Sequence, residues 1–250
     1  MNLVFKCAKE NDLYRVLKDL GLSFPRYTTL AKAINAAAEG GAVLSLADDY
    51  PRPVDRVDAE LLDRAGAKKL RMLVEYPLAF PGRKLGEPRP TVWERVVTTS
   101  EFFAPNLGKE SILAMHGCWF LPTKAGSAHL SLARLAGYRK SAYGLPKETF
   151  PILYEIPGCN VLVATSKLSQ FVTARYAPKP DWKTVWEAIL RWLCPNETIP
   201  TLDWKPTVTL QAGREAKLPK TAEMDALSRS TKWFREQVVY SIDLKKGAVE

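Results

Sequence analysis

Residues 43–51 read VLSLADDYP and residues 70–77 read LRMLVEYP, and these two stretches decide the fold. Each is a mainly apolar run that ends in one or two acidic side chains, a tyrosine and a proline. Each run is long enough for a strand buried on both faces, and a helical pattern over residues 57–67 lies between them. A strand, a helix and a second strand in succession indicate a right-handed crossover, and therefore a parallel sheet.

The same alternation begins at the N-terminus and changes character after residue 91. The pattern predicts a first strand at residues 3–8 and helices at residues 10–20 and 29–38. Strands then dominate, at residues 92–98, 112–120, 129–135, 152–156 and 161–165. The clearest helix covers residues 181–193, and its apolar stripe, which includes Trp182 and Trp186, is expected to pack against the sheet. We therefore predict an α/β fold with a mostly parallel central sheet and a strand-rich second half.

The C-terminal part differs in pattern from the rest of the chain. Residues 195–219 have little periodicity and many helix breakers, which is typical of a linker. Residues 222–239 then form a predicted helix whose apolar side needs a partner surface, on its own domain, on a second copy or on a following domain. This division predicts one domain over residues 1–204 and a linker with an appended helix over residues 205–250.

Composition and charge exclude several classes of function. The 250 residues contain 36 Lys and Arg against 27 Asp and Glu, but the two signs are interspersed, so we expect no nucleic-acid partner. No apolar run is long enough for a membrane span, and the first residues lack a signal-peptide pattern, which predicts a cytoplasmic protein without a membrane contact. The four cysteines are widely scattered, so we expect buried thiols and neither a metal site nor a cofactor.

Acidic residues follow each of the first three predicted strands: Glu10 and Asp12, then Asp48 and Asp49, then Glu75. Parallel strands place their carboxyl ends at one edge of a sheet, where open α/β sheets bind ligands. Two carboxylates in different environments can divide the roles of general acid and general base. The alternative is that these side chains cap helices and end strands.

Two further segments are candidates for ligand contacts. Lys167 and Ser169 follow another strand, where they either orient sugar hydroxyls or cap a short turn, and Arg175 is placed to bridge a strand-end carboxylate. Residues 77–90 form a long loop rich in proline and glycine that is typical either of a binding segment or of irregular packing. For Ser-His-Asp chemistry the sequence offers no G-x-S-x-G motif, and no glycine follows Cys118 at the spacing of a nucleophile elbow.

The order of the elements and several short motifs resemble the class I glutamine-amidotransferase-like superfamily. The motifs are ADDYP at residues 47–51, VEYP at 74–77, ER at 94–95, GCNVLVAT at 158–165, KLS at 167–169 and RWL at 191–193. The likeness is greatest to branches without amidotransferase activity, such as trehalose-utilisation-type proteins, β-galactosidase trimerisation domains and the domain preceding six-hairpin glycosidase-like domains in bacterial proteins. It implies a three-layer, flavodoxin-like sandwich in a carbohydrate context. The family's Cys nucleophile in a Gly-x-Cys-x-Gly turn is absent, so amidotransfer is not implied.

Three functions remain open at this point. The first is a carbohydrate-associated accessory or assembly domain for an (α/α)6 glycosidase-like partner. The second is a hydrolase of a sugar or uronide in which Asp49 and Glu75 share the catalytic roles. The ligand-binding residues are then Glu10, Asp48, Tyr50, Tyr76, Lys167, Ser169 and Arg175. The third is a homo-oligomeric scaffold without a ligand.

Overall fold

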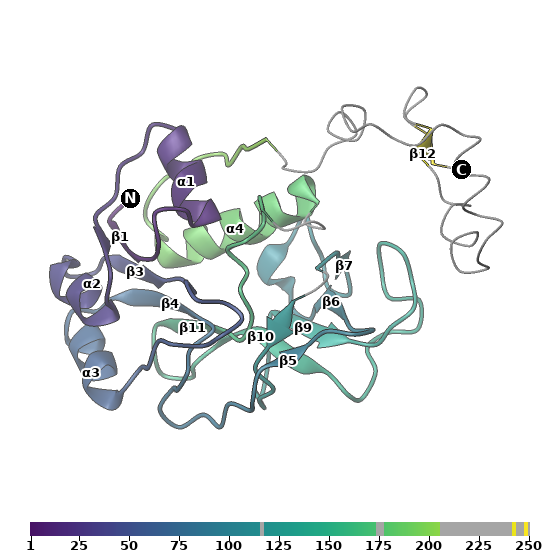
Figure 1. Ribbon diagram of the computed structural model, residues 1–250, viewed down its shortest axis with the longest axis horizontal. Helices are drawn as coiled ribbons and strands as arrows, with labels where there is room; N and C mark the ends of the chain where they lie inside the picture. Colours follow the sequence, from purple (N-terminus) through teal and green to yellow (C-terminus); the bar gives the residue numbers. More distant parts are fainter. Residues whose placement is uncertain (116–117, 174–177, 206–241, 244–247, 250) are drawn as a thin grey trace, which may run out of the picture. The chain divides into compact units, whose positions relative to one another are not determined.

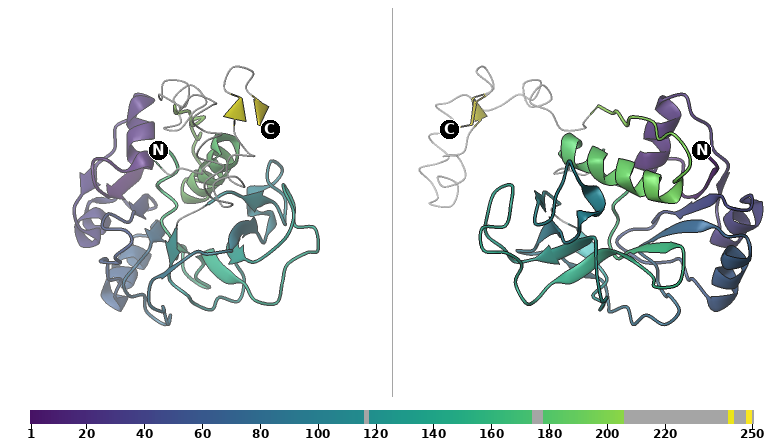
Figure 2. Two further views of the ribbon diagram at one scale, coloured as in Figure 1. Left: turned by 45° about the vertical axis from the view of Figure 1, so that its right-hand side comes forward. Right: turned by 180° about the vertical axis from the view of Figure 1, so that it is seen from behind.

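The computed structural model describes residues 1–115, 118–173, 178–205, 242–243 and 248–249 (Figures 1 and 2). The chain divides into two compact units, Met1–Lys205 and Pro206–Glu250. In the second unit the described residues form one antiparallel pair, β12 (Ile242–Asp243) with β13 (Ala248–Val249). The helix predicted over residues 222–239 lies outside the described residues.

The first unit is built on a nine-stranded mixed sheet. Its strands in spatial order are β2 (Arg26–Tyr27), β1 (Leu3–Lys6), β3 (Ala42–Ser45), β4 (Arg71–Glu75), β11 (Val161–Ala164), β10 (Phe150–Glu155), β9 (Leu130–Ala133), β6 (Arg95–Thr98) and β7 (Ile112–Leu113). The pairs from β2 to β11 are parallel, and the pairs from β11 to β7 are antiparallel. The predicted parallel sheet and the strand-rich second half are therefore confirmed.

Helices cover both faces of the parallel half (Figure 1). The helices α1 (Asp12–Asp19) and α4 (Lys179–Leu193) pack into one apolar core, and α2 (Leu30–Ala36) and α3 (Ala59–Ala67) pack into the other. Successive residues of β1 alternate between the two cores, with Leu3 and Phe5 in the first and Val4 in the second. A strand with both faces buried needs the continuous apolar run that the sequence shows.

Local sequence explains where the helices begin. Asn11 caps α1 because its side chain accepts hydrogen bonds from the backbone N–H groups of the first turn. Thr29 and Asp58 cap α2 and α3 in the same way. The fourth helix starts at Lys179, two residues before the predicted start, because Pro180 is tolerated in a first turn. Its stripe packs as expected, since Trp182 and Trp186 are buried.

One expectation about strands is wrong, and a short strand was not predicted. The single strand predicted over residues 112–120 is two short strands: β7 lies at the edge of the main sheet, whereas β8 (Trp119–Phe120) pairs with β5 (Arg89–Pro90) in a separate two-stranded sheet. The short strand β2 has no counterpart in the prediction. Two-residue strands carry too little periodicity to detect, and apolar alternation does not identify the pairing partner.

The cysteines correct one further expectation. All four are thiols, but only Cys7, Cys118 and Cys194 are buried, whereas Cys159 is exposed in the turn between β10 and β11. Burial raises the pKa of the Cys7 thiol to about 12 and that of Cys118 and Cys194 to about 11. In the part of the chain that the structure describes, no helix has the length and apolar character required to cross a membrane.

Candidate functional site

Glu75, the last residue of β4, lies at the carboxyl edge of the parallel strands and is completely buried. Its Oε1 accepts hydrogen bonds from the backbone N–H groups of Leu168 at 2.6 Å and Ser169 at 2.8 Å. Its Oε2 accepts from the Ala47 N–H at 2.9 Å and from the Ser169 hydroxyl at 2.7 Å. The carboxylate therefore ties the loop after β3 and the loop after β11 to the end of β4.

These four donors occupy the capacity of the Glu75 carboxylate, which offers about four lone-pair sites. Burial raises the pKa of Glu75, while the hydrogen bonds from Ser169 and Ala47 and the charge of Lys167 act in the opposite direction. The Ser169 hydroxyl also accepts a bond from the Asn11 side chain at 2.9 Å, which extends the network to the start of α1. The arrangement is that of a structural connection between loops.

The second strand-end acid, Asp48, belongs to an ion-pair cluster. The ammonium of Lys6 is buried and lies 3.0 Å from Asp48 Oδ2 and 2.5 Å from Asp55 Oδ2. Asp48 also accepts a bond from the Ala8 N–H through its other oxygen, at 2.6 Å. Burial lowers the pKa of Lys6, but the hydrogen bonds and charges of Asp55 and Asp48 outweigh this effect and the pKa is raised.

The remaining predicted site residues differ in their surroundings. Glu10 and Asp49 are exposed, and the Asp49 carboxylate lies 3.6 Å from the Arg52 guanidinium. Lys167 is half-buried, and Arg175 lies outside the described residues. The edge thus brings Glu75 together with Ser169 and leaves Asp49 apart, at the surface.

The two predicted tyrosines bind backbone atoms. Tyr50 donates its hydroxyl to the Trp119 carbonyl at 2.8 Å, and Tyr76 donates to the Pro51 carbonyl at 3.1 Å. Their rings pack edge to face with centroids 4.9 Å apart. Both side chains therefore hold the loop after β3 in place.

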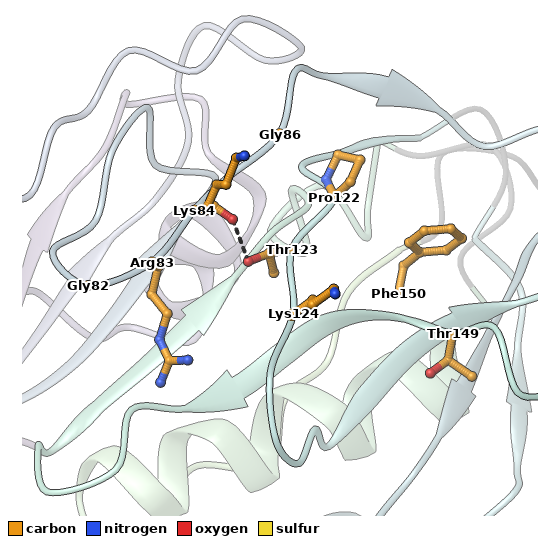
Figure 3. Close-up of a pocket in the computed structure, with 9 residues that line it drawn as sticks. All are labelled: Gly82, Arg83, Lys84, Gly86, Pro122, Thr123, Lys124, Thr149 and Phe150. Carbon is orange, nitrogen blue, oxygen red and sulfur yellow. Dashed lines mark hydrogen bonds between the residues drawn. The ribbon is translucent and has the colours of Figure 1, made fainter.

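A cleft of about 580 Å³ lies beside the loop of residues 77–90, which the sequence marks as a possible binding segment (Figure 3). Its lining residues are Gly82, Arg83, Lys84, Gly86, Pro122, Thr123, Lys124, Thr149 and Phe150. We call it the basic cleft, because these described residues include three cations and neither Asp nor Glu. Its volume is in the range of small-molecule sites.

The walls of the basic cleft are joined by hydrogen bonds. The Thr123 hydroxyl donates to the Lys84 carbonyl at 2.9 Å (Figure 3). The Gly86 N–H donates to the Pro122 carbonyl at 2.7 Å. Glycine suits position 86, because a Cβ there would lie 3.2 Å from the Pro122 carbonyl oxygen. The loop is therefore fixed close to residues 122–124.

Aromatic side chains orient the cations near the cleft. The Arg83 guanidinium lies 5.8 Å from the ring centroid of Tyr154, which is buried. Phe150 has the Arg89 guanidinium 4.7 Å from its ring centroid, and Arg89 is held by an ion pair with Glu94 at 2.7 Å. One ring, two hydroxyls and three cations thus line a site that suits a ring-shaped ligand with a negative charge.

The sequence pointed to one side of this cleft, the loop of residues 77–90, but not to the opposite side. Arg83 and Lys84 lie in the loop that was marked by its glycines and prolines. Lys124, Thr149 and Phe150 come from distant segments, and nothing in their spacing indicates that they meet. A proline–threonine–lysine segment directly after a predicted strand, at residues 122–124, is the signal that was available.

The fold and the cleft define a class: an α/β protein with a nine-stranded mixed sheet and an electropositive, ligand-sized cleft. No protein-family model matches the chain, and no curated protein matches it. Among solved structures, it is similar to the crystal structure of Agd3, described as a novel carbohydrate deacetylase, with a TM-score of 0.48 and 11% identity. The match covers 78% of this chain and 32% of that chain, so the chain spans about a third of Agd3.

Proposed function

We propose that this chain is a carbohydrate-associated domain that binds an acidic sugar in the basic cleft and serves as an accessory module of a glycosidase-like partner. The observation that carries the sugar-binding part is that Arg83, Lys84, Lys124 and the aromatic residue Phe150 line one cleft whose described lining contains no acidic residue (Figure 3). The glycosidase context rests on the family resemblance of the sequence motifs.

The chemistry of the lining favours a uronic acid over a neutral sugar. A guanidinium matches the two oxygens of a carboxylate, and the ammonium groups supply point charges. Phe150, whose ring also contacts the Arg89 guanidinium, adds apolar surface to the lining for one side of a sugar ring, and Thr149 adds a hydroxyl for its polar rim. A small inorganic anion uses the cations but leaves the ring and the rest of the volume unused.

The direct test is thermal unfolding with oligogalacturonate, with the matching neutral oligosaccharide and with inorganic phosphate. A ligand at a hundredfold excess over its Kd stabilises the folded state by about 2.7 kcal/mol. We expect the acidic oligosaccharide alone to raise the unfolding midpoint, and Lys124→Ala to weaken binding about tenfold. Lys32→Ala removes the same charge from the exposed side of α2 and is the matched control.

Two results would refute the sugar site. One is an equal response to phosphate and oligogalacturonate, which indicates a simple anion site. The other is equal binding by Lys124→Ala and Lys32→Ala. The accessory role is checked separately by reading the neighbouring coding sequence, where a helical-toroid glycosidase is expected. If no such glycosidase is encoded there, the proposed partner is refuted and the proposed sugar site is unaffected.

The alternative of a hydrolase that works through Asp49 and Glu75 is less favoured by the geometry. Glu75 is enclosed and holds four hydrogen bonds, so a substrate can reach it only after the loop of Leu168 and Ser169 moves away. Turnover of a uronide that survives Lys124→Ala and is lost in Asp49→Asn would favour this alternative over simple binding.

A further inference from the structure

Three polar side chains meet at the edge of the sheet opposite to Glu75. Ser100 follows the end of β6, His129 precedes β9, and Glu155 is the last residue of β10. The register pairs Thr98 with Leu130 and Leu130 with Leu153, so these strand ends are neighbours. The Ser100 hydroxyl oxygen lies 2.8 Å from His129 Nδ1, and His129 Nε2 lies 3.1 Å from Glu155 Oε1.

The hydrogen-bond partners determine where the protons of His129 and Ser100 lie. A carboxylate only accepts, so the bond to Glu155 requires a proton on Nε2 of His129. A neutral imidazole then has an unprotonated Nδ1, which accepts the hydrogen of the Ser100 hydroxyl. The Ser100 oxygen still accepts a bond from the Phe102 N–H at 3.2 Å, which leaves its own proton directed to His129.

The imidazole is fixed and kept neutral by its surroundings. The ring of His129 stacks on the ring of Phe102 with centroids 4.1 Å apart. Burial lowers the pKa of His129, while the hydrogen bond and charge of Glu155 act in the opposite direction. A neutral histidine near pH 7 is able to accept a proton, which is the requirement for a general base.

Ser100 opens into a second cleft of about 540 Å³. This cleft shares Thr123, Lys124 and Thr149 with the basic cleft. Gly126 and Ser127 also line it, and their backbone N–H groups form no hydrogen bond to any residue that the structure describes. An oxyanion requires backbone donors of this kind, and these two residues line the same cleft as Ser100.

We infer that Ser100 is the nucleophile of a carboxylic ester hydrolase site, with His129 as its general base and Glu155 as the residue that positions the imidazole. The inference stands on the three side chains and the second cleft, and it is independent of sugar binding. The acidic partner is a glutamate, and the nucleophile bonds Nδ1 rather than Nε2, but the division of roles is that of a serine–histidine–acid triad.

The reaction balances with water as the only co-substrate. Ser100 Oγ attacks the carbonyl carbon of the ester, and its proton passes to His129 Nδ1. The tetrahedral oxyanion collapses, the bond to the alcohol oxygen breaks, and the alcohol leaves with the proton from His129. Water then attacks the acyl-serine, gives a proton to His129, and releases the carboxylic acid as the proton returns to Ser100.

Covalent labelling tests the nucleophile without knowledge of the natural substrate. An alkyl fluorophosphonate is expected to phosphonylate Ser100 with loss of fluoride, as shown by intact mass and peptide mapping. Ser100→Ala should show no adduct, and His129→Gln should label on the order of 10² times more slowly. Ser23→Ala, at an exposed serine that is not among the residues lining either cleft, is the control and should label at the wild-type rate. Hydrolysis of p-nitrophenyl acetate should follow the same order.

A second variant is needed because Ser100→Ala also removes the hydrogen bond from the Phe102 N–H and can therefore disturb folding. In Ser100→Cys, iodoacetamide should alkylate the introduced thiol faster than the exposed Cys159, and adding His129→Gln should abolish this excess. The inference is overturned if folded wild-type protein gives no adduct at Ser100, or if His129→Gln labels equally fast.

The Glu155→Gln variant tests whether Glu155 acts on the imidazole of His129 or only stabilises the local structure. Gln can still accept the bond from Nε2 but carries no charge, and Glu155 is the charged group that contacts His129 in the described chain. Its charge raises the pKa of His129, so its removal should move the acidic limb of the labelling rate to lower pH. A limb that does not move would assign Glu155 a structural role only.

Discussion

Ser169 donates two hydrogen bonds to Glu75, one from its backbone N–H at 2.8 Å and one from its hydroxyl at 2.7 Å. This pair joins the end of β4 to the loop that follows β11, across 94 residues of sequence. With the bonds from Ala47 and Leu168, it fixes the carboxyl edge of the parallel strands. All four hydrogen bonds to Glu75 therefore come from the protein itself.

Glu75→Gln is expected to destabilise the fold by about 2 kcal/mol, because the new amide group must direct N–H donors toward the N–H of Ala47 or those of Leu168 and Ser169. Chemical denaturation of wild type and variant measures the difference. Glu87→Gln, at an exposed position, is the control and should change stability by less than about 0.5 kcal/mol. Equal stability of Glu75→Gln and wild type would show that the buried network adds nothing.

The stability difference between wild type and Glu75→Gln should depend on pH. Burial raises the pKa of Glu75 in the folded state, so the folded protein favours the protonated form more than the unfolded chain does. The contribution of Glu75 is therefore fully present below pH 4.5, the ordinary value, and is lost as the pH rises through the folded pKa.

Denaturation at a series of pH values from 4 to 8 should thus show a gap that is largest at the acidic end. Because Gln does not titrate, the Glu75→Gln variant is the reference for wild type at each pH. A gap that widens as the pH rises would mean that the four donors lower the pKa and would reverse the sign of this prediction.

Lys6→Met should destabilise the protein by about 3 kcal/mol, because it leaves the partly buried carboxylates of Asp48 and Asp55 without their cation. Thermal unfolding measures the change. Adding Asp55→Asn to Lys6→Met should recover part of the loss, since it removes one unpaired charge. Strictly additive losses in the double variant would argue against coupling between these side chains.

Gly137→Ala and Gly21→Ala form a matched comparison at two positive φ angles. At Gly137, with φ +129°, a Cβ meets the backbone carbonyl of Lys140, whereas at Gly21, with φ +80°, a Cβ has open space. Gly21→Ala should cost about 1 kcal/mol for the backbone conformation alone. Gly137→Ala should cost about 3 kcal/mol, because the backbone must also shift. Similar denaturation midpoints for the two variants would contradict the close approach at residue 137.

The sequence predicted four strands of the parallel half, β1, β3, β4 and β11, because each is an apolar run followed by polar residues, whereas the two-residue strand β2 was missed. The ends of β3 and β4 could be located to within a residue or two, and Asp48 and Glu75 were correctly placed near one edge. Their partners could not be predicted. Glu75 is enclosed by donors that lie 28 and 94 residues away, and no local pattern records such contacts.

The second half was harder to predict for a physical reason. Antiparallel strands can pair in many registers, and alternation of apolar residues fixes the face of a strand but not its neighbour. Ser100, His129 and Glu155 come together only through the registers of β6, β9 and β10. The lack of a G-x-S-x-G motif counted against Ser-His-Asp chemistry as a whole, but that motif identifies only a serine on a nucleophile elbow.

The reversal of chain direction between β11 and β10 separates two kinds of polar residue within one sheet. On the parallel side, polar residues that follow the strands, such as Asp48 and Glu75, form hydrogen bonds and ion pairs that connect the loops at the carboxyl edge. On the antiparallel side, β6 and β10 end at the other rim, where Ser100 and Glu155 both contact His129. In such a sheet, substitutions at one edge can change the chemistry of that edge without altering the contacts that stabilise the opposite edge. Chemistry and stability can therefore evolve separately.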